Sequence, residues 1–260
     1  MSPDLPANLF KRRLRAGEVQ HGLFCGLADP VAAEIVAGAG FDWLLLDAEH
    51  SPNDLRTILA QLQATAAYGT PVLVRPDAGN TVTIKRLLDL GVQTLLVPMV
   101  ESAAQATELV AAVRYPPEGV RGVGPSMARA ARWNRVGDYL DRAGDELCLL
   151  VQIESVAGLA AVEEIAAVDG IDGLFVGPSD LSASMGHRGR PRHPDVVAAV
   201  DDALRRIVAA GKPAGVFATT PDTVERWEEI GATVVAVGVD VSLFVAAIDG
   251  LAARYRQEDS

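Results

Sequence analysis

The chain has 260 residues, of which 49% are hydrophobic and only 5% aromatic, and its formal net charge is −11. This acidic balance disfavours nucleic acid as a partner, because nucleic acids attract basic surfaces. The sequence shows neither a signal peptide nor the roughly 20 consecutive apolar residues that span a bilayer, so we expect a cytoplasmic protein without a membrane partner. Cys25 and Cys148 lie in apolar runs without metal-binding or redox spacing, and we expect both to be core residues in a reducing compartment.

Short apolar runs alternate with amphipathic segments along the whole chain. Near the N-terminus, a first helix is expected to present Lys11-Arg12-Arg13 to solvent. The runs that have the length and composition of buried strands are 22–27, 43–47, 72–75, 94–98, 147–153, 173–176, 214–217 and 234–239. One helical pattern covers 53–68 with Asn53 as its expected N-cap, another covers 195–210, and the last carries Phe244, Ile248, Leu251 and Tyr255.

Eight strand–helix units predict one α/β domain over residues 1–260, folded as a single (β/α)8 TIM barrel. A doubly wound open sheet is the alternative. It normally carries a glycine-rich fingerprint after its first strand, where this chain has Leu27-Ala28-Asp29-Pro30. Residues 115–146 interrupt the rhythm with Gly119, Gly122 and Gly124 and then the basic stretch from Arg129 to Arg135, and loops of this length are usually functional or lie at an interface.

Polar residues follow the predicted strands at the points where the strands end. These runs are Asp47-Ala48-Glu49-His50, Arg75-Pro76, Gln152-Ile153-Glu154 and Gly177-Pro178-Ser179-Asp180. In a TIM barrel the carboxyl ends of the strands form the active site, so we expect these side chains to converge on one rim.

Glu154 and Asp180 end successive strands, whose backbones lie about 4.8 Å apart in a sheet. Two carboxylates this close repel each other unless they share a proton or a cation. Oxygen ligands suit Mg²⁺ or Mn²⁺, and Co²⁺ is also compatible. The sequence therefore predicts a divalent-cation site, at which a 2-oxo acid would complete the coordination and its enolate would be stabilised. The alternative is a pair of helix caps or rim salt bridges.

Arg75 keeps its charge at any working pH, so beside a keto oxygen it would stabilise the negative charge of the transition state. The alternative is a structural ion pair. Of the four histidines only His50 follows a strand end together with acids, which makes it the candidate general base, although a histidine near a helix start is often only a cap.

A Schiff-base aldolase would need a lysine in the barrel mouth. The only lysines are Lys11, Lys85 and Lys212, which belong to the N-terminal helix, a helix face and the entry of the seventh strand. We therefore expect no imine-forming lysine, and no nucleotide cofactor.

At these rim residues the chain resembles the HpcH/HpaI aldolase family, over residues 22–255. The stretches that carry the resemblance are Ala37-Gly38-Ala39-Gly40-Phe41-Asp42-Trp43-Leu44-Leu45, Leu95-Leu96-Val97-Pro98-Met99, Tyr115-Pro116-Pro117, Arg121-Gly122-Val123-Gly124 and Gly177-Pro178-Ser179-Asp180-Leu181-Ser182. The resemblance implies a metal-dependent class II aldolase, which reversibly cleaves a 4-hydroxy-2-oxo acid to pyruvate or hydroxypyruvate and an aldehyde.

The resemblance also implies roles for individual residues. Metal ligands would be Glu154 and Asp180, the enolate would be stabilised by Arg75, and the base for the substrate 4-hydroxyl would be His50. The substrate would be contacted by Gln152, Gly177, Ser179, Asp180, Val123 and Phe217. Phe217 stands where the family commonly has Leu, Phe24 where it has Trp and Ser179 where it has Ala, which leaves the aldehyde preference open.

The resemblance further implies a homo-hexamer built as a trimer of dimers, with a C-terminal helix swapped between subunits and Val123 approaching a neighbouring pocket. In the family an aspartate matching Asp89 raises the basicity of the histidine. The spacing of this chain places Asp89 at a helix end away from the rim, so either Asp47 or Asp89 of a neighbouring subunit is the expected partner of His50.

Two other functions are compatible with the sequence. A CoA-ester lyase of the citrate lyase β-subunit type would need a cationic patch for the CoA phosphates, for which Arg188, Arg190 and Arg192 are the candidates. A non-catalytic ligand-binding barrel would leave the polar residues of the rim without an explanation.

Overall fold

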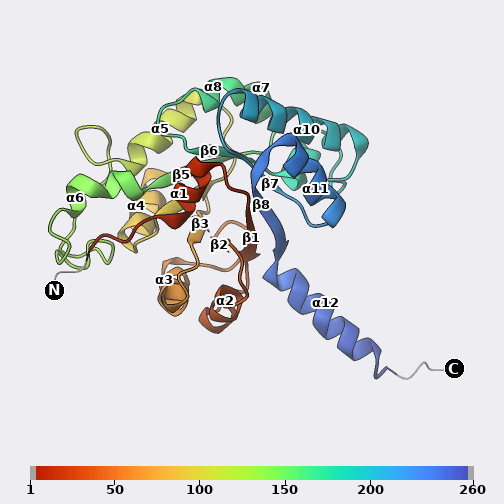
Figure 1. The fold of residues 1–260 in the computed structure, drawn as a ribbon, viewed down its shortest axis with the longest axis horizontal. Helices are drawn as coiled ribbons and strands as arrows, with labels where there is room; N and C mark the ends of the chain where they lie inside the picture. Colours follow the sequence, from red (N-terminus) through yellow and green to blue (C-terminus); the bar gives the residue numbers. More distant parts are fainter. Residues whose placement is uncertain (1–3, 257–260) are drawn as a thin grey trace.

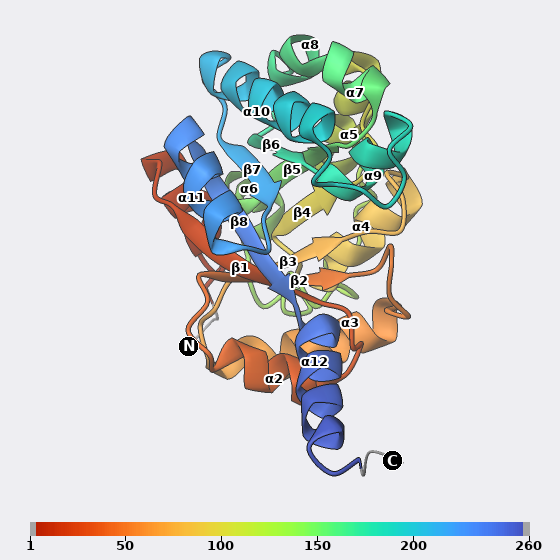
Figure 2. The same cartoon turned by 90° about the vertical axis from the view of Figure 1, so that its right-hand side faces the viewer.

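A computed structural model describes residues 4–256, in which eight parallel strands form a closed barrel in sequence order (Figures 1 and 2). The strands are β1 (Gln20–Cys25), β2 (Trp43–Asp47), β3 (Val72–Arg75), β4 (Thr94–Val97), β5 (Cys148–Ile153), β6 (Gly173–Val176), β7 (Ala214–Phe217) and β8 (Ala232–Val239). All eight predicted strands are present, with ends shifted by at most two residues. The predicted TIM barrel is therefore confirmed.

Helices surround the barrel and connect its strands (Figure 2). They are α1 (Leu9–Ala16), α2 (Pro30–Ala37), α3 (Leu55–Ala64), α4 (Thr81–Asp89), α5 (Ala103–Val113), α6 (Tyr139–Arg142), α7 (Val156–Ala160), α8 (Val162–Ala166), α9 (Pro178–Ser184), α10 (Pro194–Ala209), α11 (Pro221–Ile230) and α12 (Asp240–Ala253), with short 3-10 turns η1 (Thr65–Ala67) and η2 (Ala143–Glu146). The expected N-cap Asn53 is wrong by one residue. Asp54 caps α3, because its carboxylate accepts hydrogen bonds from the main-chain nitrogens of Arg56 and Thr57.

Alternation along each strand sorts side chains between the interior of the barrel and its helix layer. On β2, Trp43 and Leu45 pack in the interior cluster while Leu44 and Leu46 pack against the helices. Asp47, two residues after Leu45, also points into the barrel, at the carboxyl end of the strand. The same period of two continues from Leu73 to Arg75, and the sheet register places Arg75 directly beside Asp47. The strand pattern therefore fills the lower barrel with apolar residues and places the polar ones at the rim.

The large Trp43 ring fits only because its neighbour on β1 has no side chain. A Cβ at Gly22 would lie 2.0 Å from the indole. Phe10 and Leu14 of α1 join the same cluster and close the barrel at the amino ends of the strands.

Lys11 was expected in solvent, and this expectation is wrong. Its side chain is buried under the barrel, where Nζ donates hydrogen bonds to the main-chain oxygens of Asp145 and Leu147 and lies 3.8 Å from Asp172 Oδ1. Lys212 Nζ donates to the oxygen of Ile171, just before β6 begins. These two lysines therefore lie at the amino end of the barrel, opposite the rim.

The insertion 115–146 also packs at the amino end of the barrel. Ala130 donates its N–H to the oxygen of Asp89 at 3.0 Å, and Arg129 Nη1 donates to the oxygen of Leu90 at 2.7 Å, both at the end of α4. Glu146 accepts a hydrogen bond from Asn8 through its main-chain oxygen. The insertion is thus not a lid over the rim of its own barrel.

Helix α12 projects away from the barrel in both views (Figures 1 and 2). Of its residues only Asp240 is buried. The large hydrophobic side chains that it exposes are Val241, Leu243, Phe244, Val245, Ile248 and Leu251. None of the helices in residues 4–256 is long and apolar enough to cross a membrane.

Candidate active site

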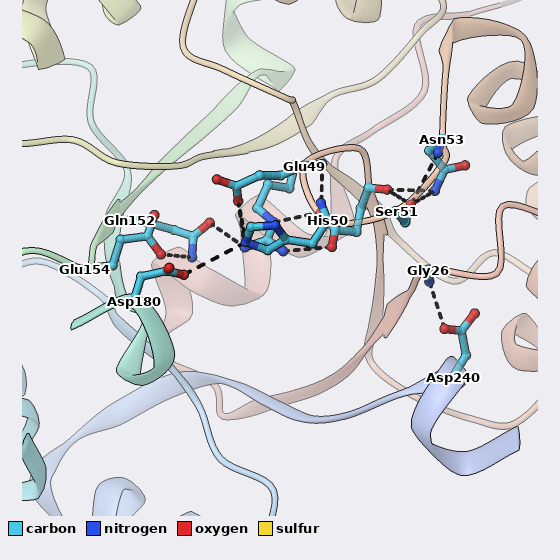
Figure 3. A network of polar contacts seen from close by, with 11 residues as sticks. Gly26, Glu49, His50, Ser51, Asn53, Gln152, Glu154, Asp180 and Asp240 are labelled. Atoms are coloured by element: carbon cyan, nitrogen blue, oxygen red, sulfur yellow. Dashed lines mark hydrogen bonds and ion pairs between the residues drawn. The ribbon is translucent and has the colours of Figure 1, made fainter. Parts of the chain in front are cut away.

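The turn after β2 brings two functional side chains to the rim. The main chain of this turn is held in place because the main-chain oxygen of Asp47 accepts hydrogen bonds from Ser51 Oγ and from Asn53 Nδ2. Asn53 is itself held by Gln61 Nε2 of α3 at 2.6 Å. Figure 3 shows Glu49 and His50 projecting from this turn toward the residues of β5 and α9.

Arg75 is buried at the centre of the rim and has carboxylates on two sides. Nε and Nη2 donate to the two oxygens of Asp47, at 2.8 and 2.7 Å. Nη1 lies 3.0 Å from Glu49 Oε2 and 3.4 Å from Gln152 Oε1. Burial alone would raise the pKa of Asp47, but the hydrogen bonds and charge of Arg75 outweigh it and the pKa is lowered. Asp47 therefore stays ionised, and the guanidinium is fixed in position.

Glu154 lies just beyond the end of β5, buried and facing the rim. Its Oε1 accepts a hydrogen bond from the main-chain nitrogen of Met99 at 2.8 Å, and its Oε2 accepts one from Gln152 Nε2 at 3.0 Å. The close packing favours a glycine just after β6, since a Cβ at Gly177 would lie 2.5 Å from Glu154 Oε2. Burial, with the nearby charges of Glu49 and Asp180, raises the pKa of Glu154 to about 7 against the opposing Met99 hydrogen bond.

Asp180 enters the site from the first turn of α9 and points toward His50 beside Glu154 (Figure 3). Its side chain is half-exposed, so it lies at the solvent-facing side of the rim. Ser179 is exposed next to it, and its main-chain oxygen accepts a hydrogen bond from Ser182 Oγ. The predicted convergence of Glu154 and Asp180 on one rim is therefore what the structure shows.

Negative charge exceeds positive charge in this pocket. Four carboxylates (Asp47, Glu49, Glu154 and Asp180) surround one guanidinium, an excess of three charges when all are ionised. Such an excess persists in a folded protein only if protons or a cation compensate it. The donors are all oxygen atoms, the ligand type of Mg²⁺ and Mn²⁺. Both the charge and the donor set therefore fit a divalent cation.

His50 is exposed at the edge of the pocket. Its Nε2 lies 3.7 Å from Glu49 Oε2 and 3.9 Å from Asp180 Oδ2. Asp47 reaches only the main-chain nitrogen of His50, at 3.5 Å, because its oxygens are bound to Arg75. Among the described contacts, Asp47 therefore meets the main chain of His50 and not its imidazole.

Asp89 lies at the carboxyl end of α4, away from the rim of its own barrel as expected. Its carboxylate lies 3.5 Å from Arg121 Nη2, and no described contact joins it to His50 of the same chain. Val123 is exposed on the insertion at the amino end of the barrel. Neither residue thus belongs to the site of its own chain.

Aromatic rings pack directly beneath the rim, beside Arg75. Phe24 and Phe217 meet edge to face with ring centres 5.3 Å apart. The Arg75 guanidinium lies 5.2 Å from the centre of the Phe24 ring.

Glu49 was not among the site residues expected from the sequence, although it belongs to the same run as Asp47 and His50.

A second group of possible metal ligands lies in the loop before α10, where the rings of His187 and His193 stack 3.7 Å apart beside Asp195. His193 Nδ1 accepts the N–H of Asp195 as the N-cap of α10. A cation bound to Nδ1 of His193 would displace this hydrogen bond. A cation bound to Nε2 would leave the proton on Nδ1, where it would point at the N–H of Asp195. The geometry therefore favours a helix cap over a metal site.

Comparisons with known proteins identify the family of the chain. The profile of the HpcH/HpaI aldolase/citrate lyase family matches residues 20–247. The chain is 59% identical to a hydroxypyruvate/pyruvate aldolase of Pseudomonas aeruginosa, over 97% of this chain and 94% of the relative. It is 52% identical to a 4-hydroxy-2-oxo-heptane-1,7-dioate aldolase of Salmonella dublin, over 96% and 95%.

A crystal structure of an HpcH/HpaI aldolase/citrate lyase family protein from Burkholderia cenocepacia superposes with a TM-score of 0.91 at 40% identity, covering 96% of this chain and 100% of that one. The chain thus belongs to the HpcH/HpaI aldolase/citrate lyase family. The predicted family and the predicted class of enzyme, a carbon–carbon lyase of the aldolase type, are confirmed.

Proposed function

We propose that the chain is a divalent-cation-dependent aldolase that reversibly cleaves a 4-hydroxy-2-oxo acid to pyruvate or hydroxypyruvate and an aldehyde. The observation that carries the proposal is the buried Glu154 beside Asp180, in a pocket with an excess of carboxylates around one fixed guanidinium. The names of the relatives at 52–59% identity support the substrate class.

In this proposal Glu154 and Asp180 hold the cation, which is Mg²⁺, Mn²⁺ or Co²⁺. When bound, the cation would supply Lewis-acid polarisation of the 2-oxo group. Gln152, Gly177 and the main chain at Ser179 would orient the pyruvyl part.

Two further residues would act on charge and protons. Arg75, whose position Asp47 fixes with two hydrogen bonds, would stabilise the negative charge that develops on the oxo oxygen during cleavage. His50 would remove the proton of the 4-hydroxyl, for which its exposed place at the pocket edge is suited. The rings of Phe24 and Phe217 would face the aldehyde part.

The proposed test combines pyruvate or hydroxypyruvate with a panel of aldehydes, with and without Mn²⁺. Product should form only with the cation and should be cleaved back in the reverse direction. The absence of any aldol product across the panel, with protein that binds Mn²⁺, would contradict the proposed reaction.

We further propose a homo-oligomer, a hexamer by family resemblance, located in the cytoplasm. The exposed apolar side chains of α12 support it, because a face of this kind is usually covered by a partner. A swapped α12 would provide that cover. Asp89 would then complete the site of a neighbouring subunit as the partner of His50, and Val123 would approach the neighbouring pocket.

Light scattering at assay concentration tests the assembly, and a fully active monomer would contradict it. The shared site needs complementation between inactive Glu154→Ala and inactive Val123→Asp proteins. Mixing them should recover activity if subunits exchange, whereas no recovery despite proven exchange would mean that each barrel works alone.

A further inference from the structure

Of the four carboxylates at the rim, Glu49 is the one to which the proposed function assigns no role. Its side chain is only 17% exposed, and its Oε2 is buried without a hydrogen-bond partner among residues 4–256. Two groups of the proposed mechanism lie beside this oxygen, Arg75 Nη1 at 3.0 Å and His50 Nε2 at 3.7 Å. A buried carboxylate without hydrogen bonds is costly, so its presence calls for a compensating charge or donor.

Arg75 does not by itself account for Glu49. Asp47 already accepts from Nε and Nη2, so the guanidinium is neutralised and held by one carboxylate. Glu49 adds a further negative charge on the side of Arg75 that faces Gln152, which in turn donates to Glu154. With Glu49, the rim carries one more negative charge than is needed to neutralise Arg75, which Asp47 already does.

A divalent cation would be stabilised by the excess of negative charge that Glu49 adds to the rim. Residues outside the ligand set commonly change metal affinity by about 10–100-fold, through charge and through hydrogen bonds to ligands or bound water. Glu49 lies beside His50 (Figure 3), and its Oε2 is 3.0 Å from Arg75 Nη1, so it contributes negative charge next to the proposed cation site.

We propose that Glu49 is a positioning residue of the cation site, which fixes Arg75 together with Asp47 and whose buried negative charge raises the affinity of Glu154 and Asp180 for a divalent cation. The inference rests on the proposed cation-dependent function. Glu49 acts without being a ligand, because its Oε2 is already engaged by Arg75 Nη1 at 3.0 Å.

The test is a titration of the metal-stripped full-length protein with Mn²⁺, in which free Mn²⁺ is followed by electron paramagnetic resonance. Glu49→Gln keeps the shape and removes the charge, and it should weaken Mn²⁺ binding about 10–100-fold. Glu49→Asp keeps the charge and changes the shape, and it should stay much closer to the unmodified protein. Glu228→Gln is the control, because Glu228 also lies beside a histidine, His21, but away from the rim, and it should bind Mn²⁺ normally.

Three results would overturn the inference. The first is unchanged Mn²⁺ affinity in Glu49→Gln, and the second is a loss of Mn²⁺ affinity in Glu49→Asp alone. The third is a loss of Mn²⁺ affinity in Glu49→Gln as complete as that in Glu154→Gln, which would make Glu49 a ligand. Failure of the unmodified protein to bind Mn²⁺ would instead overturn the proposed function. If Glu49→Gln does not fold by circular dichroism, Glu49→Asp and Glu49→Asn, which differ only in charge, make the same comparison.

Discussion

Replacing Arg75 with alanine separates its structural role from its chemical role. The side chain is almost fully buried, and its loss leaves the carboxylates of Asp47 and Glu49 without their counter-charge. Removing one partner of a buried ion pair typically costs about 3–5 kcal/mol of folding free energy. We therefore expect Arg75→Ala to unfold at a distinctly lower temperature.

The chemical effect should be larger than a loss of stability explains. Removing one charge-stabilising donor typically slows a reaction about 10²–10³-fold. Exchange of the pyruvate methyl hydrogens for deuterium, followed by NMR with saturating Mn²⁺, reports enolate formation without an aldehyde. This exchange should fall by that factor in Arg75→Ala, while Mn²⁺ still binds through Glu154 and Asp180.

Two variants control the experiment. Arg75→Lys keeps the charge but loses the planar fork that holds Asp47 through two separate nitrogens, so its rate should be intermediate. Arg226 makes the same kind of two-point contact with Asp201 between α10 and α11. Arg226→Ala should therefore lower stability without slowing exchange. Normal exchange in folded Arg75→Ala protein would remove Arg75 from the mechanism.

Four further predictions concern the cation and the base. Chelation should abolish cleavage and Mg²⁺, Mn²⁺ or Co²⁺ should restore it, whereas borohydride with pyruvate should leave the enzyme active; a lysine modified under those conditions would refute the absence of an imine. Glu154→Ala and Asp180→Ala should lose Mn²⁺ affinity and activity together, as calorimetry and an assay would show. Because the pKa of Glu154 is about 7 and the cation needs the ionised carboxylate, Mn²⁺ affinity should rise with pH up to about 7 and then level off. The metal-free protein should lose folding stability over the same pH range, since Glu154 of the unfolded chain releases its proton at lower pH. A flat pH profile would contradict both expectations. His50→Ala should slow aldol cleavage about 10²–10⁴-fold with little change in deuterium exchange, and an unchanged cleavage rate would leave His50 only a structural role.

Much of the rim could be predicted from local pattern. The period of two along a strand is set by neighbouring residues, so apolar alternation on β2 and β3 already implied which face carries Asp47 and Arg75. The carboxyl ends of consecutive parallel strands meet at one rim, which implied that Glu154 and Asp180 converge there.

Partners of charged side chains could not be predicted in this way. The contact of Arg75 with Asp47 joins residues 28 positions apart, and it depends on side-chain direction and on the turn that Asn53 holds. The same turn decides that Glu49 faces Arg75 and that His50 stays at the pocket edge. Composition gave no reason to choose among these acids.

By itself the sequence determined the barrel, the chemistry of its rim and the absence of a lysine from the predicted strand ends, because hydrophobic periodicity and residue type are properties of short segments. The tertiary structure alone decided which acid binds Arg75, that Glu49 joins the site, and that Lys11 lies buried under the barrel. These outcomes depend on distances between side chains from remote segments, and such distances exist only after the eight strands have closed into a barrel.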